Sequence, residues 1–247
     1  MFQNSSFNEL PVVIKNLLII NGLLFLASIS LDSYGVNLDR LLALHQFQSN
    51  NFLPIQLISH FFMHANFNHL FWNMFALWMF GKVLENIWGS KRFLIYYFIT
   101  AIGAAIIHII FCQFQIFEIS SKLDSNLISQ VIYAEPNTPI RETIKEAELL
   151  NMKKLYSLIN TPTVGASGAI FGILLAFGML FPNTLLYVFF AIPIKAKYFV
   201  FFYGIIELYL GFINNPNDNV AHFAHLGGML FGYILLKYWQ KNKNHFY

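Results

Sequence analysis

Six apolar stretches dominate the sequence, and each is long enough to cross a bilayer as a helix. A hydrocarbon core of about 30 Å requires roughly 17–25 helical residues. The stretches lie at Val12–Leu31, Phe67–Val83, Arg92–Cys112, Thr163–Phe181, Tyr198–Ile213 and Val220–Trp239. Because lipid offers no partner for backbone polar groups, such segments fold as helices. The sequence therefore predicts an all-α polytopic membrane protein built as a bundle of six transmembrane helices.

The composition supports a membrane protein rather than a soluble one. Charged residues make up 11% of the chain, whereas soluble domains have roughly a quarter. The basic residues form no run that follows a phosphate backbone, so nucleic acid is excluded as a partner. The single cysteine, Cys112, rules out an intramolecular disulfide and a cysteine-rich metal site. Met1–Glu9 lacks the basic start of a signal peptide, so we expect the first apolar stretch to be retained as a span.

The basic residues beside the spans indicate an orientation, because positive charges in short loops stay in the cytoplasm. With the amino terminus inside, nine of the fifteen basic residues fall on the cytoplasmic side, namely Lys15, Lys82, Lys91, Arg92, Lys195, Lys197, Lys237, Lys241 and Lys243. We therefore expect one multi-pass domain, residues 1–247, in the lipid bilayer of the cell membrane (plasma or inner membrane), with both termini cytoplasmic. The polar segment 113–160 is expected to be an extracytoplasmic insertion, with an amphipathic helical pattern over Ile140–Ile159.

A serine flanked by glycines lies in the fourth apolar stretch. If this stretch is helical, Ser167 in the segment Gly165-x-Ser167-Gly168 lies about 21 Å from its cytoplasmic end. His225 lies near the outer end of the sixth stretch, and His69 lies in the first turns of the second, which also enters from outside. An ionisable residue inside a membrane is functional by default. We expect these side chains to lie in the same leaflet.

Two pairs of glycines, each spaced four residues apart, indicate helices whose backbones approach closely. They are Gly168 with Gly172 in the fourth stretch and Gly228 with Gly232 in the sixth. His225 is three residues before Gly228 and shares its face. If the two faces pack together, Ser167 and His225 converge, as a nucleophile and its base must, to about 2.6–3.2 Å. The chemistry predicted is acyl transfer, with Ser167 as nucleophile and His225 as general base.

A second histidine, His222, competes for the role of base. It lies one turn before His225, but the positions three and seven residues after it carry His225 and Met229 rather than glycine. His222 also lies nearer the outer end of the span, where we expect water to solvate it. The register with the glycine pair therefore favours His225.

His69 and Asn73 are spaced four residues apart and share a helix face. Together with the backbone N–H of Ser167 they can form an oxyanion hole, in which donors face the charge of a tetrahedral intermediate. The alternative is that Asn73 is a buried asparagine that only bonds a helix backbone.

Two acidic residues lie in the region of the apolar stretches. Glu85 follows the second stretch on its cytoplasmic side, among the basic residues Lys82, Lys91 and Arg92, which favours a structural role in that turn. Glu207 is the lone carboxylate of the fifth stretch, and its sequence context assigns it no partner.

The histidines raise zinc binding as an alternative. The set is His60, His64, His69, His222 and His225. No HExxH motif is present, and no acidic residue accompanies these histidines. We therefore expect neither a metal nor a cofactor.

Four motifs in order resemble those of the rhomboid intramembrane serine proteases. They are His60-x-x-x-His64-x-x-x-x-His69-x-x-x-Asn73, Gly81-x-x-x-Glu85-x-x-x-Gly89, Gly165-x-Ser167-Gly168 and Ala224-His225-x-x-Gly228-x-x-x-Gly232. The resemblance covers about Ser59–Trp239, apart from the long insertion. It implies a six-helix core that cleaves the transmembrane segments of single-span membrane proteins with a Ser–His dyad and no aspartate. It also implies that Ser167 is the nucleophile, that His225 is the base, and that His69 and Asn73 form part of the oxyanion hole.

Two non-proteolytic classes compete with this interpretation. One is a catalytically silent, rhomboid-like scaffold that binds transmembrane helices, against which the intact Ser167 and His225 argue. The other is a transporter that uses intramembrane histidines, but the paired broken-helix repeat expected of that class is not visible in the sequence.

Overall fold

The computed structural model describes residues 10–133, 144–188, 191–213 and 220–241. Met1–Glu9, the start of the amphipathic pattern at 140–143 and Lys243 lie outside these residues. The elements run in the order α1 (Val12–Asp32), α2 (Leu38–Leu42), α3 (Gln56–Ser59), η1 (His60–Phe62), α4 (Phe67–Ala76), η2 (Leu77–Gly81), α5 (Lys82–Trp88), α6 (Ser90–Ser120), α7 (Ser125–Ile132), α8 (Glu146–Asn160), α9 (Ser167–Leu180), β1 (Leu185–Val188), β2 (Ile192–Lys195), α10 (Ala196–Ile213) and α11 (His222–Lys241). The fold is mostly helical, as expected.

Within the described part of the chain, three helices are long and apolar enough to cross a membrane: α1, α6 and α10. The helix α9 is apolar but shorter. The second predicted span is divided into α4, η2 and α5, because Leu77–Gly81 forms a turn of wider π-helix. A short antiparallel pair, β1 and β2, which the sequence analysis did not predict, lies between α9 and α10, with Leu185 opposite Lys195.

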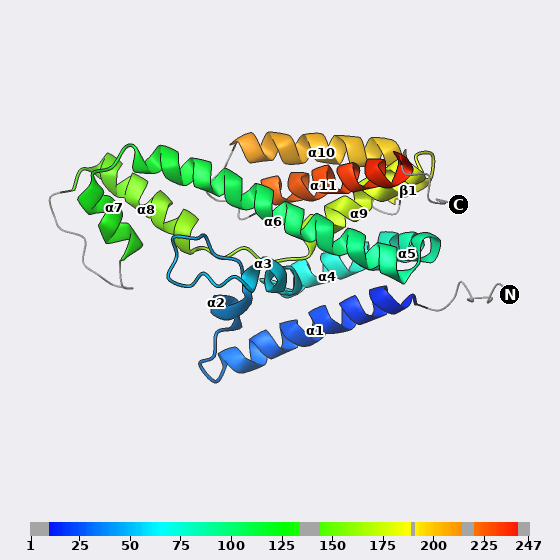
Figure 1. Ribbon diagram of the computed structural model, residues 1–247, viewed down its shortest axis with the longest axis horizontal. Helices are drawn as coiled ribbons and strands as arrows, with labels where there is room; N and C mark the ends of the chain where they lie inside the picture. The colour runs from blue at the N-terminus through cyan, green and yellow to red at the C-terminus, as the bar shows by residue number, and fades with distance from the viewer. Residues whose placement is uncertain (1–9, 134–143, 189–190, 214–219, 242–247) are drawn as a thin grey trace.

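The helix α6 continues past Cys112, where the third span was expected to end, to Ser120. Gln113, Gln115 and Glu118 are good helix formers, and no glycine or proline interrupts them, so their polarity alone does not end the helix. Figure 1 shows α7 and α8 beside this extension, away from the other helices. They bury a separate apolar cluster against it, made of Ile116, Val131, Met152, Leu155 and Ile159. The described residues of the insertion therefore form a packed helical unit.

The start of α1 is attached to the turn between α5 and α6 through Glu85. This carboxylate is buried, and it accepts hydrogen bonds from the backbone N–H groups of Val13 and Ile14, both at 2.9 Å, and from the Ser90 hydroxyl at 2.6 Å. The first N–H groups of a helix have no partner within the helix. Glu85 thus supplies the acceptors that the start of α1 needs.

The fourth helix begins later than expected, at Ser167 rather than Thr163. Thr163 exchanges two backbone hydrogen bonds with Leu44, at 2.8 and 2.9 Å, in an isolated antiparallel bridge. Gly165 has a φ of 119°, a backbone conformation that glycine adopts without strain, and its N–H donates to the His60 carbonyl at 3.0 Å. The helix cannot extend backwards through this residue. Ser167 is therefore the first residue of α9 instead of lying within a helix.

Candidate active site

The packing of α9 against α11 brings the two glycine pairs together. A Cβ added to Gly228 would lie 2.8 Å from the Gly168 carbonyl carbon, and one added to Gly232 would lie 3.3 Å from Gly172 Cα. Such short distances leave room for hydrogen only. The backbones of the two helices touch, as the GxxxG spacing predicts.

At the end of this contact, Ser167 and His225 meet. The distance from Ser167 Oγ to His225 Nε2 is 2.8 Å. Ser167 begins α9, and His225 lies in the first turn of α11. A hydroxyl held by an imidazole at this distance is the arrangement from which a nucleophile transfers its proton to a base.

The His225 ring is held on two further sides. Its Nδ1 lies 2.7 Å from Glu207 Oε2, a carboxylate of α10. Its plane stacks on the Phe171 ring with centroids 4.1 Å apart and an angle of 7° between the planes. Phe171 comes one helical turn after Ser167 and so shares its face of α9. Three helices thus fix the orientation of one imidazole.

His222 binds the same carboxylate oxygen. Its Nδ1 lies 2.7 Å from Glu207 Oε2, and both His222 and Glu207 are buried. The expectation that water solvates His222 is therefore wrong, because α10 covers this turn of α11 and provides an acceptor. Sequence reasoning missed the role of Glu207. The available signal was a single carboxylate in an apolar span, but the sequence did not show which helix that carboxylate faces.

His69 and Asn73 lie beside the loop that leads into Ser167. A Cβ added to Gly165 would lie 2.7 Å from His69 Nε2 and 3.7 Å from Asn73 Nδ2, so both side chains border this glycine. Asn73 is buried, and its Nδ2 has no hydrogen-bond partner among the described residues. A donor is therefore available next to the start of α9.

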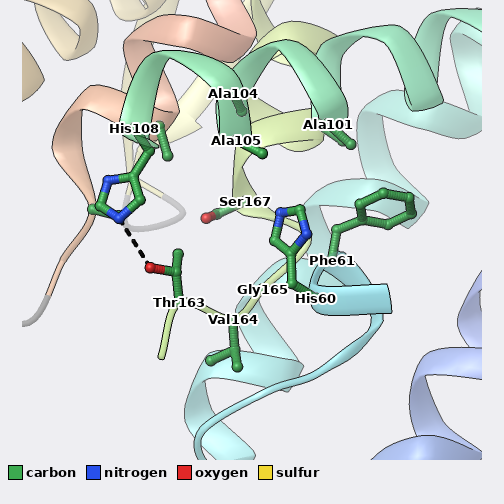
Figure 2. A pocket seen from close by; sticks show the side chains of 14 residues that line it. His60, Phe61, Ala101, Ala104, Ala105, His108, Thr163, Val164, Gly165 and Ser167 are labelled. Atoms are coloured by element: carbon green, nitrogen blue, oxygen red, sulfur yellow. Dashed lines mark hydrogen bonds between the residues drawn. The ribbon is translucent and has the colours of Figure 1, made fainter. Parts of the chain in front are cut away.

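A cavity of about 20 Å³ lies next to Ser167. Figure 2 shows the Ser167 hydroxyl between His60 and His108, with Thr163 and Val164 on the side of the loop and alanines of α6 opposite. His108 Nε2 lies 2.9 Å from Thr163 Oγ1, and His60 Nδ1 lies 2.7 Å from the Gln56 carbonyl oxygen. A polar cavity of this volume holds about one water molecule. His108 had no role in the sequence analysis.

One cluster among the described residues has the donors for a metal ion. The ligand atoms of Glu207, His222 and His225 lie within 4.8 Å of one another. This set differs from the five histidines considered above, because it contains a carboxylate and leaves out His60, His64 and His69. Both Nδ1 atoms already form hydrogen bonds with Glu207 Oε2, so the three groups satisfy one another without an ion.

The fold and the site together define an α-helical membrane protein in which a serine at a helix start meets a histidine on a neighbouring helix. The rhomboid domain model matches residues 53–241, and the chain belongs to the rhomboid family. The resemblance seen in the motifs is thereby confirmed.

A curated relative is "Rhomboid protein 1, mitochondrial" of Saccharomyces cerevisiae. The chain is 27% identical to it over 182 residues, which are 73% of this chain and 40% of the relative. The chain therefore spans less than half the length of that protein. Family membership and the apolar helices indicate a membrane protein.

Proposed function

We propose that this protein is an intramembrane serine endopeptidase that hydrolyses peptide bonds in the transmembrane segments of membrane proteins. The observation that carries the proposal is the 2.8 Å contact between Ser167 Oγ and Nε2 of the buried His225. Ser167 is the nucleophile, and His225 is the general base. Neither step of the reaction requires a cofactor.

In the acylation step one proton moves first from Ser167 to His225 and then from His225 to the leaving amine. Ser167 Oγ forms a bond with the scissile carbonyl carbon while its proton passes to His225 Nε2, and the carbonyl π electrons move onto oxygen. When the tetrahedral intermediate collapses, the C–N bond breaks and the proton on Nε2 passes to the departing amine. An acyl-serine remains.

The oxyanion of the intermediate needs donors in fixed positions. As the first residue of α9, Ser167 has a backbone N–H with no partner in the helix, at the positive end of the helix dipole. The unpaired Nδ2 of Asn73 and the imidazole of His69 border the same loop. We assign these three groups to the oxyanion hole, where the loss of one donor lowers kcat by about 10²–10³-fold.

Deacylation requires water in an apolar environment. The cavity beside Ser167 has the volume for one water molecule, and His60, His108 and Thr163 surround it with polar atoms. A water held there attacks the acyl carbonyl carbon while its proton passes to His225 Nε2. When this second tetrahedral intermediate collapses, the bond between the carbonyl carbon and Ser167 Oγ breaks, and the proton on Nε2 passes to Oγ, which restores the Ser167 hydroxyl and releases the carboxylic acid product.

The substrates proposed are single-span membrane proteins, cut near the outer ends of their transmembrane helices. In this arrangement α1, the stretch from α4 to α5, α6, α9, α10 and α11 cross the bilayer. Ser167 lies 13 residues, or about 20 Å, from the cytoplasmic end of α9. The basic residues in short loops support cytoplasmic termini, and the membrane proposed is the cell membrane. The name of the yeast relative points instead to mitochondria, and fluorescent fusions to either terminus distinguish these locations.

Reconstituted protein tests the proposal against the alternative of a helix-binding scaffold. We expect the purified protein in lipid vesicles to cleave a model single-span substrate and to become labelled by a fluorophosphonate probe. Ser167→Ala keeps a small residue at the start of α9 and should abolish both signals while the protein stays folded. Undiminished cleavage by the purified Ser167→Ala variant would exclude the serine mechanism. Binding of the substrate by the wild type, without cleavage or labelling, would establish the scaffold.

A further inference from the structure

The carboxylate of Glu207 lies at the centre of the polar cluster behind Ser167. Its helix, α10, is one of the three helices that are long and apolar enough to span a membrane within the described residues. Glu207 is 4% exposed. A buried charge is retained only where donors compensate for its lost solvation. Here Oε2 receives two contacts of 2.7 Å, from Nδ1 of His222 and from Nδ1 of His225.

These contacts determine which nitrogen of His225 carries hydrogen. An ionised carboxylate only accepts hydrogen bonds, so the Nδ1 that faces it is an N–H donor. A neutral imidazole with hydrogen on Nδ1 has its lone pair on Nε2. That lone pair is the one directed at Ser167 Oγ, at 2.8 Å. The opposite tautomer would place two acceptors, Nδ1 and Oε2, against each other and would leave Ser167 without a base.

We propose that Glu207 is a positioning residue that completes a Ser167–His225–Glu207 triad. Glu207 holds His225 in the tautomer that accepts the serine proton, and it stabilises the imidazolium that forms during acylation. The inference rests on the proposed function and departs from the dyad without an acidic member that the family resemblance implies. The proton moves only between Ser167, His225 Nε2 and the leaving amine, while Glu207 remains ionised and keeps the Nδ1–H bond throughout.

His222 has a supporting place in this arrangement. It donates to the same oxygen from the preceding turn of α11, so it helps compensate the buried charge and limits the rotation of the carboxylate. Its side chain is not the one bonded to Ser167. A further titratable residue, Tyr203, lies one turn before Glu207 on α10. The charge of Glu207 is therefore compensated by two imidazoles, those of His222 and His225.

The test compares the same substitution at two buried carboxylates. Glu207→Gln keeps the size of the side chain, removes the charge and presents an NH₂ group that can turn toward Nδ1. We expect kcat to fall by about 10²–10⁴-fold, with the upper value equal to the loss seen when the acidic member of a triad is neutralised, and KM to change much less. Fluorophosphonate labelling of Ser167 should slow to a similar degree. Glu207→Asp keeps the charge and should recover part of the loss.

Glu85→Gln is the matched control, since Glu85 is also buried but binds the start of α1 rather than a histidine. We expect this variant to unfold at a lower temperature and to keep the wild-type kcat when folded. Comparison of the two variants shows whether the loss of activity comes from removing the charge beside His225 or from removing any buried carboxylate. If Glu207→Asp were no more active than Glu207→Gln, the electrostatic part of the proposal would be contradicted.

A spectroscopic readout makes the proposal independent of turnover. In protein labelled with ¹⁵N-histidine, the imidazole shifts report which nitrogen bears hydrogen. We expect His225 to carry it on Nδ1 in the wild type and to lose this preference in Glu207→Gln. A wild-type His225 with hydrogen on Nε2 would overturn the proposal even if no variant folds. If the wild type neither labels nor cleaves, the proposed protease function fails, while the tautomer still decides the role of Glu207.

Discussion

The contact between α9 and α11 should control catalysis as well as stability, and Gly228→Ala tests this. The new Cβ would lie 2.8 Å from the carbonyl carbon of Gly168 and would overlap its oxygen. Non-bonded carbon atoms settle at about 3.5–4.0 Å, so the two backbones must separate by about 0.7 Å or more. The Gly168 carbonyl is backbone and the alanine methyl group has no alternative rotamer, so no side-chain movement relieves the overlap.

This separation acts directly on the catalytic pair, because Gly228 and His225 lie on one face of α11 and Gly168 follows Ser167 on α9. A 2.8 Å hydrogen bond that lengthens by this amount passes the limit for a useful bond. A misplacement of about 1 Å lowers turnover by about 10²-fold. We therefore expect kcat to fall by about this factor, and overpacking to destabilise the protein by about 1–3 kcal/mol.

The assay pairs cleavage of a single-span substrate with thermal unfolding of the same preparation. Gly22→Ala is the matched control, since no atom lies within 4 Å of a Cβ added to this glycine of α1. It should keep the wild-type kcat, and its free energy of unfolding should rise by about 0.5–1 kcal/mol because alanine is a better helix former than glycine. If Gly228→Ala kept both the wild-type kcat and the wild-type unfolding temperature, the close approach of α9 and α11 would not be what aligns Ser167 with His225.

Three further predictions concern the groups around Ser167. Asn73→Ala should lower kcat by about 10²–10³-fold with a smaller effect on KM, because one oxyanion donor is lost; steady-state kinetics of the folded variant measure this, and an unchanged kcat refutes the assignment. His225→Ala should eliminate cleavage and probe labelling, since Ser167 loses its proton acceptor, whereas His222→Ala should leave substantial activity; the reverse order in parallel assays would move the base to His222. Chelators should leave cleavage unchanged, because the cluster of Glu207, His222 and His225 satisfies itself by hydrogen bonds; activity lost in EDTA and restored by zinc would assign a metal to that cluster.

The convergence of Ser167 and His225 followed from spacing along two separate helices. Small residues at four-residue intervals define a face, and His225 lies in register with that face. The argument needed only that the two faces pack, which the structure shows through Gly168 and Gly228. The spacing of residues within each helix was therefore sufficient to predict that Ser167 and His225 lie in contact.

Other features depend on tertiary contacts that no local pattern specifies. The start of α9 is set by the backbone pairing of Thr163 with Leu44, a residue more than a hundred positions away in the sequence. The burial of His222 depends on the rotation of α10, whose apolar sequence has no polar stripe to show which side faces α11. The fold of the insertion depends on the apolar cluster that α7 and α8 share with the end of α6. The start of α9, the burial of His222 and the packing of α7 and α8 therefore depend on how distant segments pack together, which the local sequence does not specify.

The two carboxylates that are buried among the described residues show how a polar group in an apolar bundle acquires its role. Glu85 and Glu207 are 2% and 4% exposed, and each is retained because N–H donors compensate its charge. The donors to Glu85 from α1 are backbone amides, which do not take up a proton, so that carboxylate can only hold a helix in place. The donors to Glu207 are imidazoles, one of which reaches Ser167 with its other nitrogen. A proton that passes from Ser167 to His225 would therefore change the electrostatic interaction with Glu207, so the proposed reaction would involve Glu207 but not Glu85.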